Sequence, residues 1–281
     1  MKRNTARLQS NGSMHHVLHV VRAFSTRTLI VVGILTFSLM TACSTQPSGI
    51  DQQPGGPLNT PLATSPTVPP ELAKYLGHNL IVNGDAEAGS AGDPAGTSEQ
   101  QVVKDLPGWT RTGTLTVFPY VAGQTIGSVG EGDPRPDDHG KNYFTGGPNG
   151  GPNALAAAKQ DIDLTPLALA TDTGKLSFTL SGYLGSWGTF SNQAEVSVQF
   201  LSADHKGLGD PVHIGPVTSG NNHQSEQATG LWKRTASNTL PVGTRYVAVT
   251  LTISVDPNVR VAANNTANSG FADSISFMLK A

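Results

Sequence analysis

Apolar and polar residues alternate along much of the chain after residue 107. The clearest alternating stretches are Gly108–Val117, Lys175–Tyr183, Ala194–Leu201, Arg245–Val255 and Phe271–Leu279. Alternation over five or more residues is typical of antiparallel strands with one buried face. Shorter runs predict further strands at Leu80–Val82, Asn142–Phe144, Pro211–Ile214 and Leu231–Thr235. Many short strands between Gly, Pro, Asn and Asp turns predict an all-β fold, an antiparallel β-sandwich or jelly roll.

Two long segments between these strands are predicted as loops. One is Ser90–Asp105, which is polar and rich in Gly and Ala, and the other is Ala122–Asn142, which is acidic and rich in Gly and Pro. Loops of this length in a compact domain tend to carry function.

The first 42 residues have the pattern of a secretory signal peptide. A basic flank precedes an apolar run, Thr28–Met40, and small residues follow it. The run is too short for a relaxed membrane span, so we predict a signal peptide over residues 1–42. Met14 is an alternative start that would shorten the basic region.

The only cysteine of the chain, Cys43, follows Leu39-Met40-Thr41-Ala42. This stretch resembles a bacterial lipobox, with Met40 where Leu is usual. The resemblance implies cleavage before Cys43, acylation such as palmitate, and an extracytoplasmic lipoprotein anchored to a membrane. The alternative is an ordinary secretory cut that leaves a free thiol. A single cysteine excludes an intramolecular disulfide, so the core must hold the fold.

Residues 43–77 are predicted to be a disordered tether. The segment Ser44–Pro70 is rich in Ser, Thr, Pro, Gly and Gln, and it lacks the apolar surface that would order it. Its prolines keep it extended. Glu71–Leu76 is long enough for one helical turn that leads into a single domain over residues 78–281.

Charge is unevenly distributed between these regions. All 20 acidic residues follow Cys43, whereas five of the 18 basic residues precede it, so the remainder carries 13 basic and 20 acidic side chains. A domain with an excess of acidic residues lacks the basic patch that nucleic acids require. We therefore expect a sugar, cation or protein partner and no nucleic acid.

Both ends of the domain resemble one family of folds. The stretch Asn79–Gly89 (NLIVNGDAEAG) resembles the opening signature of bacterial modules with the galactose-binding-like, or carbohydrate-binding-module-like, β-sandwich. Phe271–Phe277 (FADSISF) resembles the late Asp signature of that family. The resemblance implies a strand over Leu155–Leu164, for which one helical turn is the alternative. It also implies a non-catalytic, carbohydrate-binding module.

The same resemblance implies a structural Ca²⁺ where the first and last strands meet. Glu87 and Asp273 would be its ligands, with Asp85 as a helper. Calcium prefers several oxygen ligands, and an acidic Gly-rich turn beside an Asp supplies them. Ala86 stands where the family usually has an aromatic residue. The alternative is that the carboxylates only cap a turn and bond to backbone amides.

Aromatic side chains provide candidates for ligand contact, because sugar rings stack on Trp and Tyr. We select Trp187, Trp232 and Tyr120 as ligand-binding candidates. Trp187 lies in a Gly-rich stretch between two predicted strands, and Trp232 heads a short strand. Packing is the alternative for both. Trp109 follows Pro-Gly and is predicted to lie in the core.

The acidic loop offers a third kind of chemistry. Asp137, Asp138 and His139 are the residue types of an acid–base pair or a metal site, but adjacent side chains in a Pro-rich loop rarely converge, and a solvated turn is the simpler interpretation. No nucleophile elbow, phosphate-binding glycine motif or zinc-type histidine spacing occurs. We therefore predict a binding module. A structural or adhesive envelope protein is the alternative, and a polysaccharide-active enzyme is less favoured.

Overall fold

The computed structural model describes residues 70–120, 127–148, 154–188, 192–217, 229–255 and 267–281. The predicted signal peptide, Cys43 and the tether up to residue 69 lie outside the described residues. Within the described part, no helix has both the length and the apolar character needed to cross a membrane.

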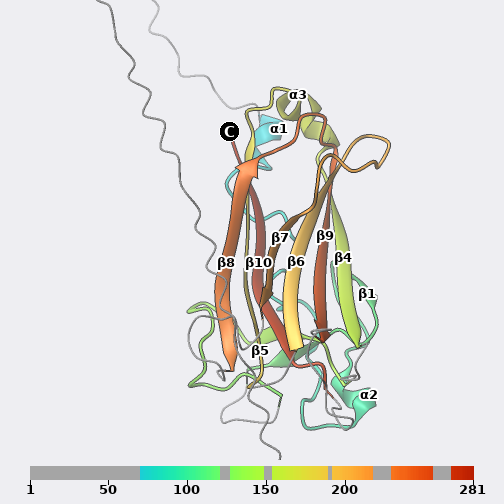
Figure 1. Cartoon of the computed structure of the whole chain (residues 1–281), viewed down its shortest axis with the longest axis vertical. Coiled ribbons are helices and arrows are strands. Elements are labelled where there is room, and N and C mark those ends of the chain that lie inside the picture. Colours follow the sequence, from blue (N-terminus) through green and yellow to red (C-terminus); the bar gives the residue numbers. More distant parts are fainter. Residues whose placement is uncertain (1–69, 121–126, 149–153, 189–191, 218–228, 256–266) are drawn as a thin grey trace, which may run out of the picture. The chain divides into compact units, whose positions relative to one another are not determined.

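Two five-stranded antiparallel sheets form the domain, as the alternation predicts (Figure 1). The β9 sheet runs in the order β1 (Thr110–Thr112), β4 (Leu155–Asp163), β9 (Tyr246–Val255), β6 (Asn192–Leu201) and β7 (Val212–Val217). The β10 sheet runs in the order β2 (Thr116–Pro119), β3 (Asn142–Thr145), β10 (Gly270–Lys280), β5 (Ser177–Ser186) and β8 (Gly230–Thr239). The short helices are α1 (Pro70–Ala73), α2 (Ser98–Gln101), η1 (Thr165–Leu167) and α3 (Ala168–Thr171).

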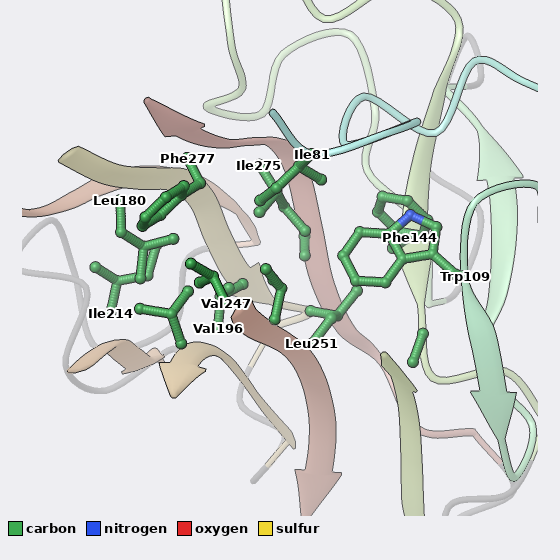
Figure 2. Packing of buried hydrophobic residues seen from close by; sticks show 14 of the residues in the cluster. Ile81, Trp109, Phe144, Leu180, Val196, Ile214, Val247, Leu251, Ile275 and Phe277 are labelled. Atoms are coloured by element: carbon green, nitrogen blue, oxygen red, sulfur yellow. The ribbon is translucent and has the colours of Figure 1, made fainter. Parts of the chain in front are cut away.

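Alternate residues of both sheets fill the space between them. On β9, every second side chain from Val247 to Ile253 is fully buried. The rings of Phe178, Phe200 and Phe277 meet at the centre, with centroids 4.9 Å apart for Phe178–Phe200 and 5.6 Å for Phe178–Phe277. Figure 2 shows other parts of this core, with Val247 and Leu251 of β9 and Phe277 of β10 among the labelled side chains. Each such side chain contributes about 1.5–3 kcal/mol, so this core stabilises a domain without disulfides.

Two strand predictions are wrong in detail. Gly108–Val117 is not one strand: Gly113 has a φ of +72°, and the turn there sends β1 and β2 into different sheets. Leu80–Val82 is not a strand either, because the chain turns there. Instead, Gly77 and Leu80 donate single backbone hydrogen bonds to Leu279 and Phe277 of β10. The ambiguous segment after Leu155 is a strand, β4.

Residues 70–77 belong to the folded domain, although the sequence placed them in the tether. Leu72, Tyr75 and Leu76 pack against the core, and Leu76 bridges to Leu279. The folded domain therefore includes the helical turn α1.

A second, smaller apolar cluster lies on the outer face of the β10 sheet. It consists of Phe118, Val129, Tyr143, Leu231 and Phe271, and we call it the outer cluster. Four of its members alternate along their strands with residues of the main core, which places them on the opposite face of the sheet. The fifth, Val129, comes from the long acidic loop, which therefore packs onto this face.

Candidate functional site

Strand β10 is interrupted next to the outer cluster. Its pairing with β5 changes register between Asp273 and Ser276, and Ser274 takes a φ of +49°. Such bulges re-aim side chains and often lie beside functional sites. Asp273 points to the same face as Phe271, yet it is 0% exposed, and the Tyr120 hydroxyl lies against it.

The buried carboxylate of Asp273 is held by two donors. The Tyr120 hydroxyl donates to Oδ2 over 2.7 Å, and the Ser274 amide donates to Oδ1 over 2.5 Å. Burial raises the pKa of Asp273 to about 8; the hydrogen bonds from Tyr120 and Ser274 oppose this, and the nearby charges of Asp85 and Glu87 add to it. Burial, together with Asp273, also holds the pKa of Tyr120 far above its usual value. This carboxyl group is therefore protonated over most of the neutral range.

The opening stretch ties the acidic loop to the sheet. Glu87 Oε1 accepts hydrogen bonds from the backbone amides of Lys141 and Asn142, over 2.7 and 2.8 Å. Asn83 and Ala86 adopt positive φ values of 52° and 58°, so the turn is tightly wound. Three strained residues, Asn83, Ala86 and Ser274, thus lie at one junction, and such strain persists where the surroundings determine the conformation.

A pocket of about 380 Å³ opens at this junction. Its walls come from the opening stretch, the bulge of β10 and the acidic loop: Asn79, Ile81, Asn83, Gly84, Asp85, Asp138, Ser274, Ile275 and Ser276. The volume lies within the range of small-molecule sites. Its exposed chemistry is two carboxylates and two hydroxyls, because the side chains of Asn79 and Asn83 are engaged with the backbone.

The donors at this junction match calcium only in part. Glu87 and Asp273 supply oxygen, the element that calcium prefers, and no described ion pair neutralises either. However, no three His, Cys, Asp or Glu side chains of the described residues gather into a cation-binding group, so Asp85 does not complete a set with Glu87 and Asp273. A calcium ion here would need backbone carbonyls for its remaining ligands.

The three predicted ligand-binding aromatics take different positions. Tyr120 is half-buried; its ring lies 4.4 Å from His139 and 4.8 Å from Tyr143. Trp187 is half-buried against the outer cluster, as Tyr120 is. Trp232 lies in the main core and is 8% exposed, so it packs between the sheets and offers no platform for a ligand. Trp109 lies in the core, as predicted.

Residues predicted for separate roles therefore meet in one place. Tyr120, selected as a ligand contact, bonds to Asp273, selected as a metal ligand. Asp138 and His139 of the acidic loop diverge: Asp138 reaches the pocket wall, whereas His139 packs against Tyr120 with the two rings tilted by 59°. Sequence reasoning missed Ser274 and Ser276 as wall residues; the departure of Asp273-Ser274-Ile275-Ser276 from its strand pairing had no sequence signal.

Comparison with known proteins finds no matching family model and no matching curated protein. Solved structures with a related arrangement include the enzymatically active domain of bacteriophage CBA120 tailspike protein 4, at 13% identity and a TM-score of 0.42, covering 72% of this chain and 21% of that one. A family 16 carbohydrate-binding module has 17% identity and a TM-score of 0.39, covering 71% and 99%.

A family 61 carbohydrate-binding module, solved with β-1,4-galactotriose, has 12% identity and a TM-score of 0.35, covering 73% of this chain and 99% of that one. Similarity at these values does not assign a function to this chain. The two antiparallel sheets of its own structure define its class, an all-β sandwich.

Proposed function

We propose that this chain is a non-catalytic carbohydrate-binding module carried by a lipid-anchored, extracytoplasmic protein. The observation that carries the binding function is the pocket beside the β10 bulge. Asp85, Asp138, Ser274 and Ser276 put carboxylates and hydroxyls on its walls, whereas Ile81 and Ile275 behind them belong to the buried core. The hydroxyls of a sugar ring form hydrogen bonds with carboxylates and hydroxyls of this kind.

The charge of the pocket narrows the class of sugar. Asp85 and Asp138 would repel the carboxylate of a uronic acid, because like charges at close range are unfavourable. Neutral hexoses and amino sugars are compatible with the negative charge of the pocket. We therefore propose that the pocket binds neutral or amine-bearing glycans.

The chemistry of the site supports binding and not turnover. A glycosidase needs a protonated carboxyl group next to the scissile bond. The described carboxyl group with a pKa raised to about 8 belongs to Asp273, which has no exposed surface and does not line the pocket. A substrate in the pocket therefore could not reach this proton donor.

A glycan array followed by titration calorimetry tests the proposed binding. We expect Asp138→Asn to weaken the Kd for the best glycan by about 10- to 100-fold, the effect of losing one charge-assisted hydrogen bond of about 1.5–3 kcal/mol. Asp137→Asn is the matched control, since Asp137 is exposed but does not line the pocket. Binding to no glycan, together with capture of a protein or cell-wall partner, would support the adhesive alternative.

We also propose that a structural calcium ion binds between Glu87 and Asp273. The support is the pair of carboxylates without a described cationic partner at the junction of the first and last segments. We expect calcium to raise the melting temperature of the wild-type chain relative to EDTA, because an ion that binds only the folded state stabilises it. Asp273→Asn should lose this gain and Asp137→Asn should keep it; an equal gain in all three would exclude the site.

The anchor at Cys43 is supported by the sequence alone, through the position of the sole cysteine after an apolar run. Mass spectrometry of the protein purified from membranes tests it. The expected N-terminus is a Cys43 that carries acyl chains, and a chain with an unmodified thiol would contradict the anchor.

A further inference from the structure

One end of the domain presents two fully apolar side chains to solvent. Leu169 of α3 is 90% exposed, and Val242, in the turn between β8 and β9, is 59% exposed. We call these two residues the apolar tip. A leucine with nine-tenths of its surface in water contributes little to the stability of the domain, so its side chain remains available for contact outside the domain.

The fold holds both residues of the tip in place. On the short helix, Leu167 and Thr171 are buried, which turns Leu169 outward. Val242 stands in a tight turn in which the Thr244 hydroxyl donates to Pro241 O over 2.6 Å and Gly243 has a φ of +83°. The buried neighbours of Leu169 and Val242 therefore fix the outward orientation of both side chains.

The two segments that carry the tip are joined to each other. Arg245 forms a bidentate pair with Asp172, at 3.0 and 2.9 Å, and also donates to the Thr171 hydroxyl. A Cβ added at Gly174 would lie 3.1 Å from Val242, which places the turn against the segment that follows α3. The charge of Asp172 is thereby neutralised, and Lys175 is exposed nearby.

The described chain enters the domain at this same end. Helix α1, which begins at Pro70, packs against η1, which leads directly into α3 (Figure 1). Cys43 precedes Pro70 by only 27 residues. A chain of this length cannot span more than about 95 Å even when it is fully extended. A lipid on Cys43 would therefore confine the domain to the neighbourhood of the bilayer.

From this geometry we propose that the apolar tip docks on the surface of the lipid bilayer. Leu169 and Val242 insert into the interfacial layer, and the exposed Lys175 faces the headgroups. Tethering makes this contact intramolecular, so a small apolar area suffices for docking. The domain then stands on the membrane in one orientation. This inference rests on the proposed anchor at Cys43.

Hydrogen exchange on tethered protein tests the docking. The chain from Cys43 onward, which retains the whole compact unit 63–281, is coupled through its single thiol to a maleimide-headgroup lipid in phosphatidylcholine–phosphatidylglycerol vesicles. We expect amide exchange over 165–174 and 241–246 to slow several-fold on tethering, relative to the same protein mixed with vesicles that lack the reactive lipid.

Matched variants make the result decisive. The double variant Leu169→Ser, Val242→Ser should lose this slowing, whereas Leu155→Ser, which removes a 52% exposed leucine from β4, should keep it. Equal exchange with and without tethering, or slowing that survives in the double variant, would overturn the docking. Chemical coupling makes this test independent of whether cells acylate Cys43, and the glycan titration separately reports the function of the pocket.

Discussion

At the scale of single residues, Asp273 defines the character of the site. Its carboxyl group has no exposed surface and no cationic partner among the described ion pairs. It accepts hydrogen bonds from the Tyr120 hydroxyl and the Ser274 amide. An ionised carboxylate in such surroundings is costly, so the group binds a proton or a metal ion. The protonated form and the proposed calcium-bound form would be alternatives, between which pH and chelation would select.

We expect the stability of the wild-type domain in EDTA to fall as the pH rises from about 4 to 8. The carboxyl group has a pKa of about 3.9 when unfolded and about 8 when folded. The folded state therefore holds an extra proton in this window, and each pH unit removes up to about 1.4 kcal/mol as that advantage is lost.

The measurement is a series of thermal melts across this pH window. Asp273→Asn cannot ionise, so the difference between wild type and variant should favour wild type more at pH 4 than at pH 8. A difference that does not change with pH would show that the carboxyl group titrates normally. The same series in calcium should reverse the trend, because the ion needs the carboxylate.

The residues around Asp273 show what sequence reasoning can reach. Asp273 is selected from the sequence through the resemblance of Phe271–Phe277 to a family signature, and the structure places it in a buried hydrogen-bonded position. Its partner Tyr120 stands 153 residues away, and no local pattern relates two side chains so far apart. Trp232 is predicted as a ligand contact yet lies in the core, because its strand begins with three buried residues in a row, of which Leu231 and Trp232 face opposite sides of the sheet.

At the scale of elements, the side chain of Asn79 forms the hydrogen bonds to β10 that a neighbouring strand would form. Asn79 donates to Ile275 O over 2.9 Å and accepts from Phe277 N over 2.9 Å, as a paired backbone would. It also accepts from Ile81 N over 3.0 Å. Asn79 therefore extends the β10 sheet along a segment that does not itself form a strand.

Removing this side chain should destabilise the domain measurably. Asn79→Ala leaves the Ile275 carbonyl and the Phe277 amide without partners, and we expect a loss of about 1–3 kcal/mol in urea unfolding. Asn79→Asp retains both acceptor bonds but turns a carboxylate oxygen toward the Ile275 carbonyl, so it should not restore the stability of the wild type. Equal stability of the alanine variant and wild type would show that water replaces the side chain at no cost.

Element prediction succeeded where burial is one-sided and regular. Strands β6 and β9 alternate without exception from Asn192 to Leu201 and from Tyr246 to Val255, and both were found close to their ends. It failed at Gly113, where a glycine turn divides an alternating stretch between two sheets. Periodicity reports which residues face inward, but not which sheet they join.

At the scale of the whole molecule, one buried asparagine connects the two sheets. Asn268, just before β10, accepts from Asn192 of β6 over 3.0 Å and donates to the Ile253 carbonyl of β9 over 3.0 Å. Both partners belong to the β9 sheet, whereas Asn268 leads into the β10 sheet. Its side chain is therefore a polar link across an otherwise apolar interior.

Asn268→Ala should cost about 2–4 kcal/mol, because it leaves a buried amide and a buried carbonyl unsatisfied. Asn238→Ala is the control: Asn238 is exposed near the end of β8, and its loss should change the free energy of unfolding by less than about 0.5 kcal/mol. Chemical denaturation curves give both values. Similar midpoints for the two variants would contradict a linking role for Asn268.

The order of the strands constrains how the domain can be made. Strand β10 is the last strand in sequence, yet it lies in the middle of its sheet, between β3 and β5. A nascent chain that has not yet released residues 270–280 cannot assemble that sheet, since its two halves have nothing to join them. A pairing between distant segments also forms slowly. The β10 sheet therefore forms only after residues 270–280 have left the ribosome, later than every strand that it pairs with.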